Sequence, residues 1–343
     1  MRELLSSFMA HHSSATLVRR DAVSTTPTKG LLWGLLGVAA FSFTVPFTRV
    51  AVGGLSPLFI GSARAVVAAT MAAFALAITR QGLPHVRQWL RLAVVAGGVV
   101  VGFPLLTSFA LRTTPANHGA VVIALLPAAT ATMAVLRGHE RPPRSFWVIA
   151  GVGAVAAMGF ASAQWGGIGN LRWSDLLLFG AVVAPAIGYD EGGLLARELG
   201  AWQTVSWALV LCLPLMVFLT VLSAVQQPPS GTPVQWAAFA YLGLVSMFLG
   251  FFAWYHGLAI GPMAQVSQVQ LVQPVLSICW AAVLLGEHLT WSTVLGGLVV
   301  ILCAGAAVRV RLGLASTKGP TWSDCPAPRG ETRGGRTLRE TRS

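Results

Sequence analysis

The sequence predicts an all-α polytopic membrane protein with ten transmembrane helices arranged as two inverted five-helix repeats. Three observations carry this prediction. The chain of 343 residues is 55% hydrophobic and only 10% charged, whereas soluble chains carry about 25% charged residues. Its apolar residues gather in runs long enough to span a bilayer, and one residue pattern occurs twice at a fixed distance. A chain of this composition cannot cover itself with polar surface, so its solvent is largely lipid.

The first element of the prediction is the set of spanning helices, numbered 1 to 10 in chain order. A helix needs about 20 mostly apolar residues to cross a bilayer. Ten runs meet this requirement: 30–52, 55–79, 92–111, 117–136, 146–163, 175–195, 202–225, 234–256, 265–285 and 291–310. Short breaks containing Gly or Pro separate them, as is typical of turns. Helices are favoured over barrel strands because the runs are apolar throughout, whereas barrel strands alternate over about ten residues.

The segments outside these runs are polar. Residues 1–29 are rich in Ser and Thr, and residues 315–343 contain mainly Gly, Pro, Arg, Thr and Ser. Both are predicted to be disordered tails because they hold too few apolar side chains to pack. The predicted domains are therefore a tail over 1–29, five helices over 30–163, five helices over 175–312 and a basic tail over 315–343.

The net charge of +12 does not indicate a nucleic-acid surface. Ten of the 23 Lys and Arg residues lie in the two tails and the others are scattered between apolar runs, whereas a nucleic-acid site gathers them on one face. Cytoplasmic loops of membrane proteins carry an excess of Lys and Arg. The distribution of these residues among the loops predicts a multi-pass protein of the cytoplasmic membrane, surrounded by lipid, with both termini in the cytoplasm.

One pattern occurs twice. Residues 127–140 read PAATATMAVLRGHE, and residues 274–287 read PVLSICWAAVLLGE. Pro127 and Pro274 open the two stretches, Glu140 and Glu287 close them, and each pair is 147 positions apart. Each half then holds five helices, an odd number, so the second half crosses the membrane in the opposite direction to the first. Inverted repeats of this kind build secondary transporters with the substrate site between the halves. A duplication that only builds a stable bundle is the alternative.

Three stretches resemble a known domain family. Residues 33–69 read WGLLGVAAFSFTVPFTRVAVGGLSPLFIGSARAVVAA, residues 110–142 read ALRTTPANHGAVVIALLPAATATMAVLRGHERP, and residues 257–305 read GLAIGPMAQVSQVQLVQPVLSICWAAVLLGEHLTWSTVLGGLVVILCAG. They are similar to the EamA domain, and Arg64 falls at the family's arginine in its second helix. The resemblance covers roughly residues 30–312 as two tandem domains. It implies the drug/metabolite transporter superfamily, with ten helices, cytoplasmic termini and usually export of small metabolites.

Arg64 is the candidate for binding an anionic group. It lies nine residues into helix 2, about 14 Å from the helix start at a rise of 1.5 Å per residue, which places it at mid-membrane. A charge at that depth costs about 2.5–3.5 kcal/mol, so it needs a partner or a water-filled cavity. Arg64 either faces the substrate or ties helix 2 to carbonyl groups at the end of a neighbouring helix.

Helices 6 and 8 carry four further candidates. Asp190 and Glu191, a departure from the EamA pattern, offer carboxyl groups for proton coupling or for binding a cation; alternatively helix 6 ends at Gly188 and both are solvated. Tyr189 and Trp254 could stack on a solute, although Trp254 also fits an interfacial aromatic belt. Together with the arginine of helix 2, the acidic pair would suit a zwitterion such as an amino acid.

Helix 9 is polar for a membrane helix. Gln270, Gln273 and Ser277 share one face at i, i+3, i+7 spacing, and Gln265 and Gln268 lie on another face. At least one face is predicted to line the substrate path with uncharged donors and acceptors. The alternative is that the amides hydrogen-bond to neighbouring helices.

The repeated Pro and Glu residues are assigned structural roles. Glu140 and Glu287 close their helices near opposite membrane surfaces, where a carboxylate accepts backbone N–H groups from the start of the following helix. Pro127 and Pro274 fall inside apolar runs, where proline kinks a helix and frees carbonyl groups. His118, at the outer start of helix 4, is explained by solvation.

These observations favour a secondary transporter, an exporter of a small amino acid-like or drug-like metabolite that works by alternating access. The sequence has no GxxxxGK[ST] motif, so a gradient supplies the energy, and protons are a candidate coupling ion. No enzyme, cofactor or metal site is predicted, because HExxH, GxSxG and CxxC are absent from the sequence. A polytopic membrane enzyme and a passive channel are the alternative functions, and a homodimer stays open.

Overall fold

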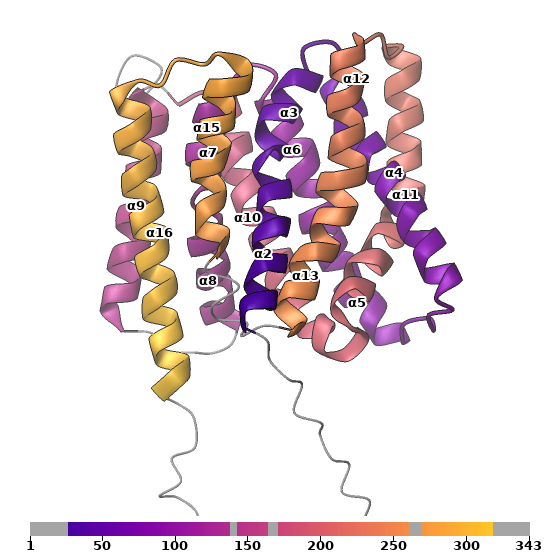
Figure 1. Ribbon diagram of the computed structural model, residues 1–343, viewed down its shortest axis with the longest axis horizontal. Coiled ribbons are helices and arrows are strands. Elements are labelled where there is room, and N and C mark those ends of the chain that lie inside the picture. The colour runs from indigo at the N-terminus through magenta and orange to yellow at the C-terminus, as the bar shows by residue number, and fades with distance from the viewer. Residues whose placement is uncertain (1–26, 138–142, 164–170, 261–268, 318–343) are drawn as a thin grey trace, which may run out of the picture.

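A computed structural model describes residues 27–137, 143–163, 171–260 and 269–317. Within these ranges the chain is helical and forms no strand. Figure 1 shows the helices side by side in one bundle, with the start of α2 and the end of α16 at the same end, at the bottom of the view. Two chain ends on one side are what an even number of crossings requires.

The two halves of the chain contribute similar sets of elements. The first half forms α2 (Pro27–Ser42), α3 (Thr44–Ala51), α4 (Pro57–Ile78), α5 (Val86–Val95), the π-helix η1 (Ala96–Gly102), α6 (Phe103–Ala110), α7 (Ala116–Ile123), α8 (Leu126–Arg137) and α9 (Arg144–Ala163). The second half forms α10 (Trp173–Leu199), α11 (Ala201–Gln226), α12 (Pro233–Ala240), the π-helix η2 (Tyr241–Leu249), α13 (Gly250–Ile260), the 3₁₀ turn η3 (Val269–Val272), α15 (Gln273–Leu285) and α16 (Trp291–Thr317).

Eight helical segments of the described chain are long and apolar enough to cross a membrane. They are Thr28–Ala51, Pro57–Ile78, Val86–Ala110, Ala116–Met133, Arg144–Ser162, Ala201–Gln226, Pro233–Gly257 and Trp291–Val310. The other two predicted spans correspond to α10, which contains several ionisable residues, and to the shorter apolar segment Val269–Leu285. The all-α polytopic fold is confirmed, while length and composition support eight of the ten predicted spans.

The helices pair across the two halves in a repeated way. The first helix of each half packs against the third helix of the other half: α2 against α13, and α10 against α5, η1 and α6. The second helices pair as α4 with α11, the fourth as α7 with α15, and the fifth as α9 with α16. In Figure 1 the pair α9–α16 forms one side of the bundle and the pair α4–α11 the opposite side. A pseudo-two-fold axis between the halves would produce this exchange of equivalent partners.

The first helices of the two halves run in opposite directions. Arg49, near the end of α3, donates hydrogen bonds to the carbonyl oxygens of Leu111 (2.7 Å) and Arg112 (2.8 Å), between α6 and α7. At the same end α10 begins, because its Asp175 contacts His118 in the first turn of α7. The α2–α3 segment therefore ends where α10 starts, as the predicted inverted repeat requires.

Small residues let the paired helices approach closely. A Cβ atom on Gly257 of α13 would lie 2.6 Å from the backbone nitrogen of Gly34 in α2. A Cβ atom on Gly98 of η1 would lie 2.2 Å from the carbonyl oxygen of Ala184 in α10. Helices in lipid attract one another mainly by van der Waals packing, which close backbone contact increases. The two equivalent contacts, α2 with α13 and η1 with α10, both depend on glycine.

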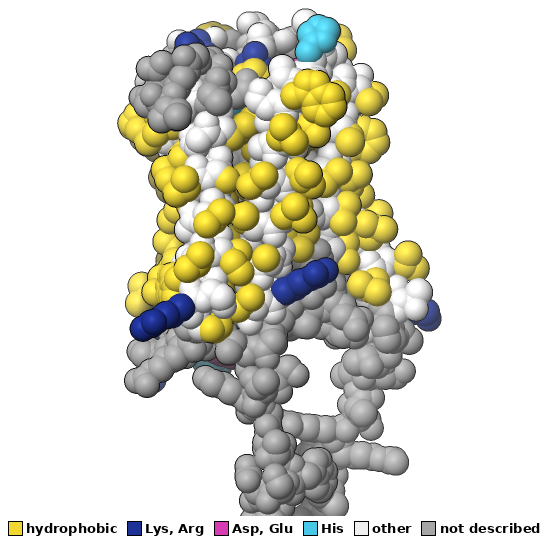
Figure 2. All heavy atoms as spheres, turned by 90° about the vertical axis from the view of Figure 1, so that its left-hand side faces the viewer, with side chains coloured by type: hydrophobic (Ala, Val, Ile, Leu, Met, Phe, Trp, Pro, Cys, Tyr) yellow, Lys and Arg dark blue, Asp and Glu magenta, His cyan; other side chains and the backbone are white. Residues whose placement is uncertain are grey.

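The outer surface is apolar over most of the helix length. Figure 2 shows a belt of hydrophobic side chains on the side of the bundle where α9 and α16 lie, with Lys or Arg side chains near its upper and lower borders. Exposed apolar residues on these two helices include Val148, Val152, Val155, Met158, Leu295, Leu298, Val299 and Leu302. Such a belt fits contact with lipid tails, and charged groups at its borders reach the polar headgroups.

Two helices extend further than the sequence indicates. The helix α10 continues to Leu199, past the predicted span 175–195, which excludes the alternative that helix 6 ends at Gly188. The helix α16 continues to Thr317, past residue 315 where the sequence predicts the start of the basic tail. The other residues of the tails, 1–26 and 318–343, lie outside the described residues. So do Glu140, Gln265 and Gln268.

Candidate functional site

A cavity of about 50 Å³ lies between the two halves, in the interior of the bundle. Both halves contribute to its wall, through their first, third and fourth helices and through α4. The lining residues are Phe41, Thr44, Arg64, Val99, Phe103, Pro104, Leu126, Tyr189, Ser246, Met247, Phe251, Gln270 and Gln273. The described wall therefore combines aromatic rings and neutral polar groups with one cation.

The cavity wall repeats between the halves. Four pairs of lining residues illustrate the repeat, three of them 147 positions apart and the pair Phe41 and Tyr189 148 positions apart. The pairs are Phe41 with Tyr189, Val99 with Ser246, Pro104 with Phe251, and Leu126 with Gln273. The π-helices η1 and η2, which also overlap at the repeat offset, both contribute to the wall. A pseudo-two-fold axis through the cavity would bring equivalent residues of the two halves together in this way.

Arg64 is almost fully buried, with 2% of its surface exposed. Its Nη2 donates to the hydroxyl of Thr107 at 3.3 Å, and its Nε has no hydrogen-bond partner. Among the carboxylates whose side chains the structure describes, none lies within ion-pair distance of it. A buried cation with unused donors is costly unless a counter-ion or water reaches it. This geometry favours the prediction that Arg64 faces a solute over the prediction that it binds helix-end carbonyls.

The face of helix 9 that carries Gln270, Gln273 and Ser277 lies at the cavity. The two glutamines line it, and neither amide has a hydrogen-bond partner among the residues that the structure describes. Ser277 is buried and donates to the carbonyl of Ser42 at 2.7 Å. It lines a smaller adjoining cavity of about 10 Å³, which shares both glutamines with the main one. The polar face thus leads from the main cavity along α15.

Helices 4 and 9 are both interrupted at the cavity. Helix 4 breaks between Ile123 and Leu126, and helix 9 changes from η3 to α15 at the equivalent position, 147 residues later. Pro127 and Pro274 lie at the second position of the helices that follow these breaks, rather than kinking a continuous helix as predicted. Discontinuous helices expose backbone groups and form substrate sites in many transporters.

The candidates in helices 6 and 8 are placed differently from one another. Tyr189 lines the cavity. Trp254 is buried against Gly37 of α2 and is not part of the described wall. Glu191 is likewise absent from that wall and pairs with Arg91. Asp190 lies within α10, and its side chain is outside what the structure describes.

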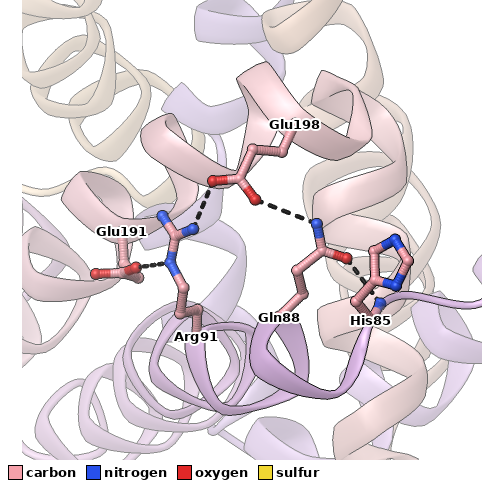
Figure 3. A network of polar contacts seen from close by, with 5 residues as sticks. All are labelled: His85, Gln88, Arg91, Glu191 and Glu198. Atoms are coloured by element: carbon pink, nitrogen blue, oxygen red, sulfur yellow. Dashed lines mark hydrogen bonds and ion pairs between the residues drawn. The ribbon is translucent and has the colours of Figure 1, made fainter.

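A polar network joins α5 to the last turns of α10, as Figure 3 shows. Arg91 donates through Nε to Glu191 and through Nη1 to Glu198, the latter at 2.6 Å. Gln88 donates to the second carboxylate oxygen of Glu198 at 3.1 Å and accepts the backbone N–H of His85 at 2.8 Å. The hydrogen bonds from Arg91 and Gln88 hold the pKa of Glu198 below its usual value. The network ties the first half to the second at the end of the bundle where α5 begins.

Glu287 ties the halves together at the other end. Its two carboxylate oxygens accept the backbone N–H groups of Ala116 at 2.7 Å and Asn117 at 2.8 Å. These are the first residues of α7, whose N–H groups have no partner within the helix. The carboxylate therefore binds a helix start, as the sequence indicated, but that helix belongs to the other half. The expectation that Glu287 binds the following helix, α16, is wrong.

His118 is the residue that the sequence interpretation places incorrectly. Solvation was expected to explain it, yet only 1% of it is exposed, and its Nε2 lies 2.7 Å from Oδ1 of Asp175, which is fully buried. Asp175 also accepts the backbone N–H of Arg172 at the start of α10. The pair connects α7 of the first half to α10 of the second. The only sequence signal for this pair is that Asp175 lies in the first turn of an apolar helix. An acidic residue is favourable at a helix start even without a histidine partner, so the signal does not identify the pair.

A multi-pass bundle of apolar helices, with a partly polar cavity between two repeated halves, defines a membrane transport protein. The model of the EamA-like transporter family matches residues 28–162 and 172–308, and the chain belongs to that family. The protein named "Uncharacterized transporter YdeK" of Bacillus subtilis (strain 168) is 43% identical over 290 residues, which cover 82% of this chain and 98% of that protein. A solved structure entitled "Crystal structure of protein" shares the fold, with a TM-score of 0.56 at 18% identity over 84% of this chain and 99% of that chain. The resemblance to EamA domains is confirmed, and the protein is a membrane transporter.

Proposed function

We propose that this protein is a secondary transporter that exports a small metabolite across the cytoplasmic membrane by alternating access. The substrate binds in the cavity between the halves, where Arg64 holds its anionic group. The observation that carries the proposal is one buried cation in a wall built from equivalent residues of both halves.

The charge of the substrate follows from the surroundings of Arg64. The guanidinium group has five N–H donors in a planar fork, which matches the two oxygens of a carboxylate. Its described hydrogen bonding consists of one long contact to a hydroxyl group. An anionic solute would supply the missing acceptors and the counter-charge together, so binding it removes the cost of burying the cation.

Alternating access requires the halves to part at one end while they stay closed at the other. The contacts that close the two ends are chemically different. At one end Arg91 bridges Glu191 and Glu198. At the other end Glu287 binds the start of α7. Because the two sets share no residue, each end can open without disturbing the contacts at the other.

The direction and the energy source rest on sequence arguments. The excess of Lys and Arg in alternate loops places both termini in the cytoplasm. The EamA resemblance implies export of small metabolites. Without a phosphate-binding loop in the sequence, the free energy comes from a gradient, and protons are the candidate coupling ion.

Counterflow in proteoliposomes tests the proposal. Liposomes containing the purified protein are loaded with a cell metabolite extract and diluted, and mass spectrometry identifies the solutes that leave faster than from protein-free liposomes. We expect anionic solutes to leave at a rate that saturates and that rises when the same solute is present outside. A rate that grows linearly and shows no exchange would indicate a channel. No protein-dependent release under any imposed gradient would refute transport.

Variants of Arg64 test the site. Arg64→Gln removes the charge and should lower the exchange of anionic solutes at least about tenfold, since a hydrogen bond to a charged group contributes roughly 1.5–3 kcal/mol. Arg64→Lys keeps the charge without the fork and should retain part of the activity. Arg112→Gln, at an exposed arginine outside the cavity wall, is the matched control. Normal exchange by folded Arg64→Gln protein would remove Arg64 from the site.

A further inference from the structure

The polar groups of the cavity region come unequally from the two halves. Four neutral polar residues of the second half have apolar counterparts at the repeat offset in the first half. The pairs, with the second-half residue first, are Tyr189 with Phe41, Ser246 with Val99, Gln270 with Ile123, and Gln273 with Leu126. Three of the pairs are similar in size and differ mainly by a hydroxyl or amide group, whereas Ser246 is also smaller than Val99.

The apolar counterparts act as an internal control for the fold. At three of the four pairs both halves form the same type of helix, and Leu126 and Gln273 each begin the helix after the interruption; Ile123 ends α7, whereas Gln270 lies in the 3₁₀ turn η3. An apolar side chain is therefore compatible with these three positions, and helix formation does not require the polar group. Gln270 and Gln273 have no hydrogen-bond partner in the described chain. Both side chains are partly exposed and line the cavity, so their amides are available to hydrogen-bond to a polar solute there.

The charged residue of the described cavity wall also comes from one half. Arg64 comes from the first half, and its counterpart at the repeat offset is Leu211 or Cys212. Among the side chains that the structure describes, which do not include that of Asp190, the wall offers no carboxylate for an ammonium group, and Glu191 is engaged by Arg91 outside that wall. The wall can therefore neutralise a carboxylate and hydrogen-bond to neutral groups, while apolar surface is supplied by Phe41, Phe103 and Phe251.

We propose that the substrate is a small monocarboxylate with an apolar body and a neutral hydrogen-bonding group, and not a zwitterionic amino acid. Arg64 binds its carboxylate, and Gln270 and Gln273 select for the neutral group. This inference rests on the proposed function, because it assigns the substrate class of the same cavity. It replaces the zwitterion that the acidic pair Asp190 and Glu191 indicated in the sequence.

Four related compounds test the substrate class. Phenyllactate, phenylpropionate and phenylalanine share a ring and a carboxylate but carry a hydroxyl group, a hydrogen atom or an ammonium group beside it, and phenyllactamide lacks the charge. Binding to the purified protein is measured by calorimetry, and exchange is measured by counterflow. Phenyllactate should bind about three- to tenfold more tightly than phenylpropionate, as one neutral hydrogen bond implies. It should bind at least about tenfold more tightly than phenylalanine or phenyllactamide. Phenylalanine brings an ammonium group into the cavity beside the cation Arg64, and phenyllactamide has no negative charge to pair with Arg64.

Substitution by the counterpart residues identifies the selecting side chains. The double variant Gln270→Ile, Gln273→Leu carries the first-half residues, so it should fold. It should bind phenyllactate and phenylpropionate about equally while keeping the wild-type affinity for phenylpropionate. Gln227→Leu, the same type of change outside the cavity wall, should keep the wild-type ratio. Thermal unfolding in detergent verifies that each variant is folded.

The outcomes separate this inference from the proposed function. Tighter binding of phenylalanine than of phenyllactate would overturn the substrate class, and a wild-type ratio in the folded double variant would remove the two glutamines from selection. If metabolite extract shows counterflow but none of the four compounds binds, transport stands and the proposed class is wrong. If no solute shows counterflow, the proposed function itself fails.

Discussion

Replacing Glu287 with glutamine should weaken the contact that closes one end of the bundle. The carboxylate accepts two backbone N–H groups, at 2.7 and 2.8 Å, from the start of α7. A glutamine side chain has one acceptor oxygen and no charge, so it keeps one of these bonds at most. A hydrogen bond to a charged group contributes roughly 1.5–3 kcal/mol, and a charge at a helix start about 0.3–1 kcal/mol. For this half-buried residue we expect a loss of about 2 kcal/mol, which favours opening of this end by about 30-fold.

Cysteine accessibility measures that opening. Ile123 is 6% exposed and lines the smaller cavity behind the Glu287 contact. In a background in which the four native cysteines are alanine, Ile123→Cys is treated with a membrane-impermeant maleimide. Its modification rate should rise by up to about 30-fold in Glu287→Gln and stay unchanged in the control His288→Gln, at the neighbouring exposed residue. An unchanged rate in folded Glu287→Gln protein would show that the carboxylate does not hold this end closed.

Three further predictions concern stability. Gly257→Ala places a Cβ atom 2.6 Å from backbone atoms of α2 and should destabilise the fold by about 1–3 kcal/mol in thermal unfolding, whereas Gly151→Ala, with open space around it, should have little effect. His118→Leu breaks a buried pair between the halves and should cost about 3–5 kcal/mol; a loss below about 1 kcal/mol would show the pair to be dispensable. The lowered pKa of Glu198 means that its contact with Arg91 stabilises the protein at neutral pH and is lost as the pH falls through that pKa. Glu198→Gln should remove this part of the acid dependence of the unfolding temperature.

The sequence determined the class of fold because a backbone that spans a lipid bilayer forms either a helix or a closed barrel. Every N–H and C=O group inside a membrane must be paired within its own segment, so a long apolar run becomes a helix whatever its neighbours are. The two copies of the Pro–Glu pattern, 147 residues apart, also predicted the equivalence of the halves. The sequence does not determine where α10 ends, because Gly188 and the two acidic residues after it fit a helix end as well as a continuing helix.

The candidate site was predicted in part. Arg64, Tyr189, Gln270 and Gln273 are polar groups within apolar runs, and the structure brings all four to one cavity. Trp254 has the same kind of sequence context, yet it packs against α2 instead. The composition of a run indicates that a helix crosses the membrane but does not specify which face turns inward. That orientation depends on packing against helices that are distant in the chain.

The contacts at the ends of the bundle were decided by tertiary structure alone. The sequence placed Glu287 and His118 at helix ends, and local rules then assigned the carboxylate to the following helix and the imidazole to solvent. In the folded chain Glu287 binds the start of α7, 171 residues away, and His118 pairs with Asp175, 57 residues away. Helix formation depends on neighbours within four residues, so the sequence determines it locally. The partner of a polar group at a helix end depends on which helices lie side by side, and only the packed bundle settles that.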